Sequence, residues 1–387
     1  MLQFLLSSLR LPVRLRCFGA KLRPGAKLRL VPSTFTRRCL LPHQHPGARL
    51  RLVPSTFTRL CLVAAFLCSL GPPATGQSPP AENRIQAFLA PSDTLHKGRL
   101  WLLAGGGAAA YTATSIGLYS IWYKDYPLGK FHFFDDYGEW ENMDKAGHLF
   151  TAYAESYLAY KGARWTGIQE RPAAWIGAGV GTLLQATIEV MDGFSEGWGF
   201  STADFAFNTA GVGLFLGQEL LWQDQRVMVK VSHTRPNYGS ALLTSSTGVT
   251  RTIDEAATIL YGKFPASFVK DYNAMTVWAS VNPASFFPKK KKLFFPRWLN
   301  IAGGYGAQNV YGAYGNAITD SQGNVFFLHE YPRYRQYYLS LDADLRRIPT
   351  RSRALRTLFT ALSWIKLPSP TIEWNSLGEQ KFYWLYW

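Results

Sequence analysis

The sequence predicts an α+β protein in which a membrane-associated helical bundle of about four helices, residues 100–222, precedes a mixed region with antiparallel strands. Two observations lead to this prediction. The first part contains long, weakly charged stretches rich in Gly and Ala, which are typical of packed or membrane-spanning helices. After Trp222 charged residues return, and alternation of apolar and polar residues there is typical of strands.

The first expected helix is Leu100–Tyr123, which has 24 residues and no charge. About 20 such residues span a bilayer, although a buried helix of a soluble bundle has the same composition. Gly177/Gly181 and Gly213/Gly217 form Gly-x-x-x-Gly pairs, which let helices approach closely. The other three helices are expected at Asn142–Arg164, Ala173–Val190 and Ser201–Trp222.

The C-terminal region is expected to contain short helices at Ile253–Tyr261 and Thr350–Ile365. Lys289–Lys292 is typical of a solvated turn, with contact to membrane headgroups as the alternative. The aromatic end, Lys381–Trp387, fits either a buried strand or a contact with a partner. Strands are expected at Arg226–Ser232, Trp298–Gly306 and Tyr337–Leu345.

The first 76 residues differ from the rest in charge, because they hold twelve Lys or Arg and no Asp or Glu. The remainder has 29 basic and 25 acidic residues, so the overall charge of +16 does not indicate a nucleic-acid partner. Gly25–Leu40 returns almost unchanged as Gly47–Leu62, which indicates a duplicated leader. The apolar run Leu60–Leu70, with small residues up to Gly76, is typical of a secretory signal peptide.

The cysteines support export. All four lie in the leader, so cleavage would leave a chain without disulfides, thiolate metal sites or a Cys nucleophile; they are Cys17, Cys39, Cys61 and Cys68. We expect an exported protein in the periplasm or membrane of a Gram-negative envelope. The residues before Cys68 fit an acylation site poorly, so lipidation is not favoured.

Four regions are expected along the chain. They are a basic repeated leader with a signal peptide (1–76), a tether (77–96), a helical bundle with a polar cluster (97–222) and a mixed α/β region (223–387). Charged side chains interrupt the bundle. On a helical projection Asp144, His148 and Glu155 form one stripe, whereas Lys145 lies about 100° away from it.

The next two helices also carry polar residues. Glu189 and Asp192 lie in a last helical turn, at the negative end of the helix dipole, so a cation is expected to compensate them. Asp204 and Asn208 share one face of the following helix. Ser201 and Asp204 also resemble a capping box, which is a purely structural role.

Ionisable groups on apolar helices usually face one another, so these residues are expected to form one polar cluster. His148 and Glu189 are candidate acid–base partners that would activate a water. Alternatively, His148, Glu189 and Asp192 would hold a divalent metal ion. Lys145 is expected as a counter-charge. A structural ion-pair network is the remaining interpretation, and the spacing does not choose among the three.

Five motifs stand out along the chain. They are Asp144–His148, Glu189–Ser195, Trp198–Ser201 with Asp204 and Asn208, Val269–Asn273 and Pro296–Gly306. Together they resemble the YfiM-like family of predicted periplasmic lipoproteins, a bacterial domain of unknown function. The resemblance covers roughly residues 100–310 and implies an envelope location without assigning a reaction. The Asp-Lys-x-x-His start with a later Asp-x-x-x-Asn also resembles VanZ-like membrane proteins.

We therefore expect a cell-envelope protein with membrane or envelope partners and an inter-helix His/acid cluster. Whether the chain is an enzyme is left open. One alternative is a hydrolase that acts on a lipid-linked or glycan envelope substrate, with His148 and Glu189 at its centre. The other is a structural partner of an envelope assembly.

Overall fold

The computed structural model describes residues 84–124 and 126–387. All of the described residues belong to one compact unit, Gln77–Trp387. The predicted leader, signal peptide and cysteines lie outside the described residues.

The described residues contain eight α-helices and a set of strands that pair mainly in one sheet. The helices are α2 (Arg84–Leu89), α3 (Lys97–Leu118), α4 (Met143–Trp165), α5 (Glu170–Gly193), α6 (Thr202–Trp222), α7 (Ile253–Tyr261), α8 (Ala266–Lys270) and α9 (Arg353–Leu362). Shorter helical turns are the π-helical η1 (Tyr119–Tyr123) and the 3-10 turns η2 (Glu139–Asn142), η3 (Pro283–Phe286) and η4 (Leu345–Arg347). The strands are β1 (Phe133–Phe134), β2 (Phe200–Ser201), β3 (Val227–His233), β4 (Leu242–Thr244), β5 (Thr250–Thr252), β6 (Met275–Val281), β7 (Leu299–Gln308), β8 (Ala317–Thr319), β9 (Val325–Phe327), β10 (Tyr334–Ala343), β11 (Ser369–Asn375) and β12 (Gln380–Tyr386).

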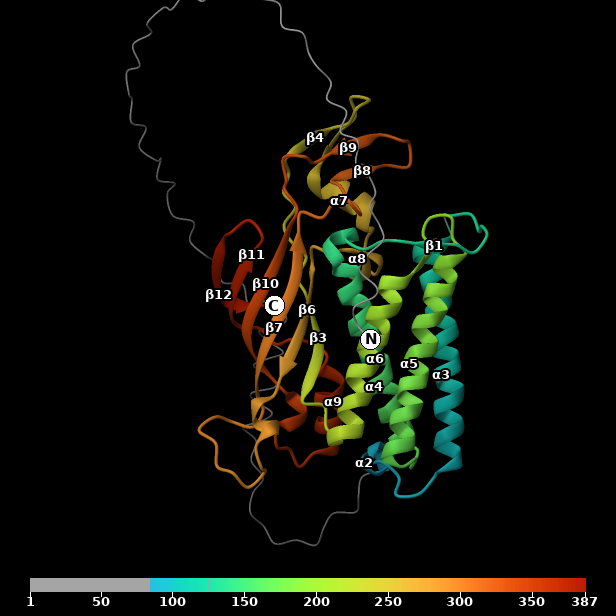
Figure 1. Cartoon of the computed structure of the whole chain (residues 1–387), viewed down its shortest axis with the longest axis vertical. Coiled ribbons are helices and arrows are strands. Elements are labelled where there is room, and N and C mark those ends of the chain that lie inside the picture. The colour runs from blue at the N-terminus through green and yellow to red at the C-terminus, as the bar shows by residue number, and fades with distance from the viewer. Residues whose placement is uncertain (1–83, 125) are drawn as a thin grey trace, which may run out of the picture. The chain divides into compact units, whose positions relative to one another are not determined.

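Helices α4, α5 and α6 lie side by side (Figure 1). Small residues make this possible, because a Cβ added at Gly177 or Gly181 of α5 would come within 2.4 or 2.1 Å of an α4 atom. Gly211 of α6 is equally close to α4, at 2.4 Å. The first predicted glycine pair therefore lies at a helix contact. A Cβ at Gly213 or Gly217 would meet nothing within 4 Å, so the second pair does not.

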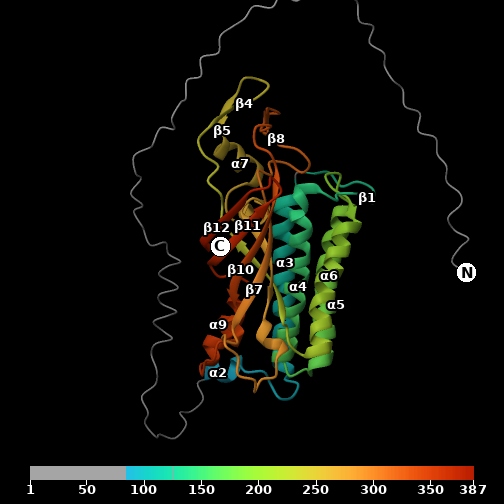
Figure 2. The same ribbon diagram turned by 60° about the vertical axis from the view of Figure 1, so that its left-hand side comes forward.

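An antiparallel sheet of six strands, in the order β12-β11-β10-β7-β6-β3, lies beside the helices (Figures 1 and 2). Its β3 and β6 strands pack on the helical layer, where Val229 and Val277 share a core with Tyr153 of α4 and Phe215 of α6. Alternate side chains point to the other face of the sheet, where Trp278 is fully buried. Helices and sheet thus share one hydrophobic core.

A smaller core covers one end of the helices. Residues Ile253 and Tyr261 of α7 pack there against Ile318 of β8, and the two hairpins β4–β5 and β8–β9 surround them. Figure 1 shows this part above the sheet and helices. Trp140 of η2 packs against this core, which fixes the segment that leads into α4.

The predicted architecture is wrong, although helices and antiparallel strands are both present. Among the described residues, only α5 is long and apolar enough to cross a membrane, by length and composition alone, and 33% of its apolar window is buried. Helix α3, the expected first helix of the bundle, has no buried residue. Because α4 and α6 also share a core with the sheet, a membrane-associated bundle of about four helices does not describe the fold.

The aromatic end of the chain forms a strand, but not the buried strand that was one of its two interpretations. Lys381–Trp387 contributes most of β12, which pairs with β11. Phe382 and Trp384 are exposed there, so this edge strand is not a buried one. Strands β6 and β11 of the large sheet were not predicted, and neither were the short strands β1, β2, β4, β5, β8 and β9. The predicted strands at β3, β7 and β10 differ from the observed ones by a few residues at their ends.

Candidate functional site

The segment before α4 reverses direction through an unusual backbone. Trp140, Glu141 and Asn142 have φ angles of 50°, 55° and 60°, a left-handed conformation that costs a non-glycine residue about 1–3 kcal/mol. Arg333 and Arg335 from the sheet region bind the Glu141 carboxylate at 3.1 and 2.9 Å. These ion pairs hold the reversal, which brings the preceding loop over the first turn of α4.

Lys145 is the first centre of the polar cluster, and its side chain is fully buried. Its ammonium lies 2.6 Å from Asp136 Oδ2, 2.9 Å from Asp204 Oδ1 and 3.4 Å from Asp144 Oδ2. The Ser201 hydroxyl donates to Asp136 Oδ1 at 2.6 Å and caps α6 by accepting from the backbone N–H of Asp204. Burial by itself would raise the pKa of Asp136. Hydrogen bonds with Asp204, Lys145 and Ser201 outweigh burial and lower this pKa.

His148 is the second centre, one turn further along α4. Its Nδ1 lies 3.1 Å from Asn208 Oδ1 and 3.4 Å from Glu189 Oε1. The Asn208 amide donates to the same Glu189 oxygen at 3.0 Å. On its other side, His148 Nε2 lies 3.9 Å from Asp144 Oδ1 and 4.0 Å from Asp204 Oδ2. Both of these distances are too long for hydrogen bonds.

The acids outnumber the bases, and the pKa values reflect this. Burial disfavours the charged imidazole of His148, but three surrounding carboxylates, led by Asp144, outweigh burial and raise its pKa to about 9. Burial is the main cause that raises the pKa of Glu189 to about 7, with His148 opposing it. Burial and the neighbouring Asp144 also raise the pKa of Asp204. The cluster therefore holds more carboxyl groups than its two basic side chains could compensate if all the acids were ionised.

Three side chains are arranged as a candidate metal site. Asp144, His148 and Asp204 each offer one ligand atom, and these atoms lie within 4.8 Å of one another. The hydroxyl of Tyr272 donates to Asp144 Oδ1 at 2.8 Å and so orients that carboxylate. Beside this group, Oε2 of Glu189 is buried and has no hydrogen-bond partner among the described residues. One imidazole with carboxylates is a ligand set suited to divalent transition metals.

Two of the predicted site residues have other partners. Asp192 accepts a hydrogen bond from the Tyr123 hydroxyl at 2.7 Å, and burial raises its pKa to about 6. Glu155 accepts from the Gln185 amide at 2.8 Å, and burial raises its pKa to about 7. The structure thus brings together Lys145, Ser201 and the residues around His148, while these two acids lie to either side.

Two residues of the cluster were not predicted. Asp136 lies in a polar, aromatic loop whose sequence gives no sign that it folds back onto α4. Tyr272 comes from the segment before β6, more than a hundred residues from α4, and reaches Asp144. The sequence did point to Tyr272, because this residue belongs to the Val269–Asn273 motif that contributed to the family resemblance.

The acids and amide around His148 occupy one continuous stretch of sequence. Residues 132–216 match the model of the family DUF2279, described as a predicted periplasmic lipoprotein. The matched stretch runs from before Asp136 to beyond Asn208 and leaves out Tyr272. Neither curated proteins nor solved structures give a significant match to the chain.

This match confirms the localisation expected from the sequence: the chain is an exported protein of the periplasm or cell envelope. It supports the description as a predicted periplasmic lipoprotein and gives no support to the narrower YfiM-like or VanZ-like resemblance.

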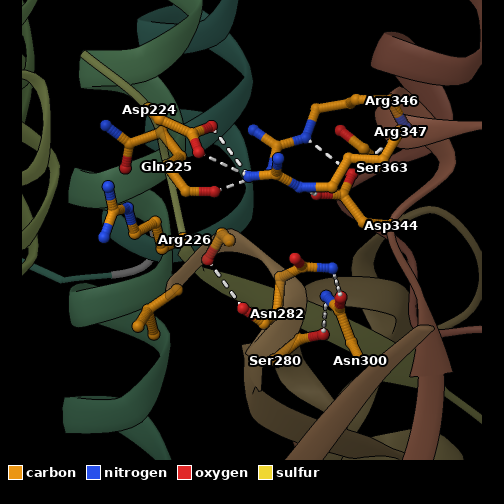
Figure 3. Close-up of polar contacts among 12 residues, drawn as sticks. Asp224, Gln225, Arg226, Ser280, Asn282, Asn300, Asp344, Arg346, Arg347 and Ser363 are labelled. Carbon is orange, nitrogen blue, oxygen red and sulfur yellow. Dashed lines mark hydrogen bonds and ion pairs between the residues drawn. The ribbon is translucent and has the colours of Figure 1, made fainter. Parts of the chain in front are cut away.

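A second buried charge network lies at the opposite end of α4, beside a cavity of about 210 Å³ (Figure 3). Arg347 binds both oxygens of Asp224, at 2.8 and 2.7 Å. The Asp344 carboxylate forms ion pairs with Arg346 at 2.7 Å and with Arg347 at 2.9 Å. Two arginines thus meet two carboxylates. Lys161 and Glu219 also line the cavity, so acids and bases are equal in number around it.

Proposed function

We propose that this cell-envelope protein binds a divalent cation at Asp144, His148 and Asp204. The observation that carries the proposal is the position of His148 Nε2. It faces two carboxylate oxygens at 3.9 and 4.0 Å without hydrogen-bonding to either. An ion between these atoms would interact with all three.

The opposite side of the ring supports this assignment. Asn208 donates its amide to Glu189, so its carbonyl oxygen is the atom that faces His148 Nδ1. Nδ1 then carries a proton that it donates to Asn208. Nε2 is also protonated while the pKa of His148 stays raised, and an ion that binds there would displace this proton and take the lone pair. Histidines that bind metals commonly donate their other N–H to such an acceptor. Asn208 and Glu189 would therefore act as positioning residues.

Charge balance also supports a cation. Asp136, Asp144, Glu189 and Asp204 face Lys145 and His148, so ionisation of all four acids would leave two of them without a cationic partner. Buried charges are stable when they are paired or coordinate a metal. A divalent ion would supply the missing positive charge.

The proposed ligand set differs from the predicted one. His148 is common to both, but Glu189 lies on the Nδ1 side of the ring and Asp192 binds Tyr123. Asp144 and Asp204 take their place. A cation was expected beside the acids at the end of α5. We propose it one helix away instead, between α4 and α6.

Equilibrium dialysis of the purified protein against Zn²⁺ and Mn²⁺ tests this proposal. We expect one ion per chain, bound at least about a hundredfold more weakly by His148→Ala and about 10–100-fold more weakly by the positioning variant Asn208→Ala. His329→Ala, at an exposed histidine outside the cluster, is the matched control and should bind as the wild type does. Absence of binding, or equal binding by His148→Ala, would contradict the proposal.

An acid–base hydrolase is the second candidate. It is favoured by Glu189, whose pKa of about 7 allows proton exchange near neutral pH and whose Oε1 lies 3.4 Å from His148 Nδ1. The test is product release from isolated envelope lipids and glycans. Turnover lost in both Glu189→Gln and His148→Ala would support this candidate, and absence of turnover by the wild type would count against it.

A further inference from the structure

The loop between η3 and β7, residues 287–298, has a composition unlike the rest of the C-terminal region. Lys289–Lys292 stand between two phenylalanine pairs, Phe286-Phe287 and Phe294-Phe295. We call residues 286–296 the basic loop. In Figure 1 it is the orange loop that extends beyond the lower ends of β6 and β7.

One arginine organises the backbone of the basic loop. The Arg297 guanidinium donates to the carbonyl oxygens of Pro288, Lys289 and Lys291 at 2.9, 2.7 and 2.9 Å. Its other terminal nitrogen donates to Ala284 at 3.4 Å. Since these carbonyl groups converge on one guanidinium, the loop has a defined shape that directs its side chains away from the turn.

The four lysines of the basic loop are all exposed. Within the described residues none of them forms an ion pair with an acid; Lys291 instead lies over the Phe287 ring at 4.6 Å. No Asp or Glu occurs between Asp271 and Asp320 in the sequence. The loop therefore carries a concentrated positive charge that no acid among the described residues neutralises in an ion pair.

Large apolar side chains accompany this charge. Phe294 is 99% exposed, and Phe286 and Phe287 are also exposed. At the base of the loop, Phe286 contacts Trp222 at the end of α6, with 5.8 Å between the ring centres. An aromatic side chain in water loses the free energy that burial would provide.

We propose that the basic loop binds an anionic lipid surface. Clustered lysines are attracted to negatively charged headgroups, and aromatic side chains insert at the boundary between headgroups and acyl chains. A projecting tip that presents both kinds of side chain matches a broad, fluid, anionic surface, whereas an acidic protein would have to provide a fitted pocket for Phe294. This inference does not depend on the proposed cation site.

Sedimentation of the full chain with vesicles tests the proposal. The vesicles contain phosphatidylcholine either alone or with 30% phosphatidylglycerol. We expect stronger binding to the anionic vesicles and a loss of that preference when all four lysines of Lys289–Lys292 are changed to Gln. At roughly fivefold per lysine, affinity should fall on the order of a hundredfold or more. High salt should weaken the wild type similarly.

Matched variants keep the test specific. Changing four exposed lysines elsewhere to Gln removes the same charge and should leave most of the preference intact; these are Lys124, Lys130, Lys161 and Lys263. Phe294→Ser should weaken binding several-fold, whereas Leu128→Ser, at another exposed apolar residue, should not. The proposal is wrong if the basic-loop variant binds like the wild type. It is also wrong if Phe294→Ser has no effect and soluble polyglutamate competes as well as vesicles do, because the partner would then be an acidic polymer.

Discussion

The two buried charge networks at opposite ends of α4 differ in one respect. Around Asp344 the carboxylates and guanidinium groups are equal in number and in direct contact (Figure 3). Around His148 the acids exceed the bases, and within the part of the chain that the structure describes a buried oxygen of Glu189 has no hydrogen-bond partner. Burial of charge is common to both networks, so burial alone does not indicate a functional site. A surplus of carboxyl groups beside a buried oxygen without a partner distinguishes the His148 cluster.

A third network in the sheet supports the distinction. Lys230 and Asp342 are fully buried and lie 2.6 Å apart. The neighbouring ammonium of Lys366 donates to the Leu367 carbonyl and the Ser369 hydroxyl, both at 2.7 Å. Two ammonium groups thus face one carboxylate, but each of these three groups forms a hydrogen bond or an ion pair within the described residues. We therefore interpret the sheet network as structural and the helical cluster as a binding site.

The largest expected effect is on the balanced network. Asp344→Ala removes the carboxylate between Arg346 and Arg347 and leaves two cations without their shared partner. Loss of one member of a buried ion pair destabilises by about 3–5 kcal/mol. Urea denaturation should show this loss. Asp254→Ala, which breaks an exposed pair with Arg235, should cost about 0–1 kcal/mol; equal costs would show that the Asp344 network is not structural.

A smaller effect concerns pH and the sheet. Burial, with Lys230 nearby, outweighs Asp342 and lowers the pKa of Lys366 to about 8, below the usual value for an unfolded lysine of about 10.4. Between these values the folded chain binds fewer protons than the unfolded chain, so the free energy of unfolding rises with pH, by about 1–3 kcal/mol in total.

Lys366→Met should remove that rise, because it replaces the titrating group with an apolar side chain of similar length. Urea denaturation of both proteins at pH 7, 8.5 and 10 measures the difference. Parallel pH dependence in the two proteins would mean that Lys366 is not the group responsible.

The smallest effect has the opposite sign and belongs to the helical cluster. Glu189→Gln keeps an oxygen that accepts from Asn208 but removes one surplus negative charge. In the presence of a chelator at pH 8 we expect the variant to be about 1 kcal/mol more stable than the wild type, a gain typical of replacing groups held in place for function. A clear loss of stability would indicate that the Glu189 charge is already compensated within the chain.

Local signals in the sequence were sufficient for part of the site. Asp144, Lys145 and His148 were identified because charge is rare on an apolar helix, and Asp204 and Asn208 because they lie one turn apart. The choice between Asp192 and Asp144 as neighbours of His148 depends on the crossing of α4, α5 and α6. Helical periodicity within one segment does not encode that crossing.

The fold was less predictable than the positions of its helices. Leu100–Tyr123 has the composition of a buried or spanning helix, yet α3 has no buried residue. The decisive contacts are long-range: Val229 and Val277 of the sheet share a core with Tyr153 of α4 and Phe215 of α6. Alternation predicted strands β3, β7 and β10, but it carries no information on which layer they cover.

The central claim is that the surplus acids of the helical cluster bind a cation. The most direct measurement is the free energy of unfolding with and without saturating Mn²⁺. At 100–1,000 times the dissociation constant, we expect a gain of about 2.7–4.1 kcal/mol for the wild type, an equal gain for Lys366→Met and none for His148→Ala. No gain for the wild type, or the same gain for His148→Ala, would contradict the account.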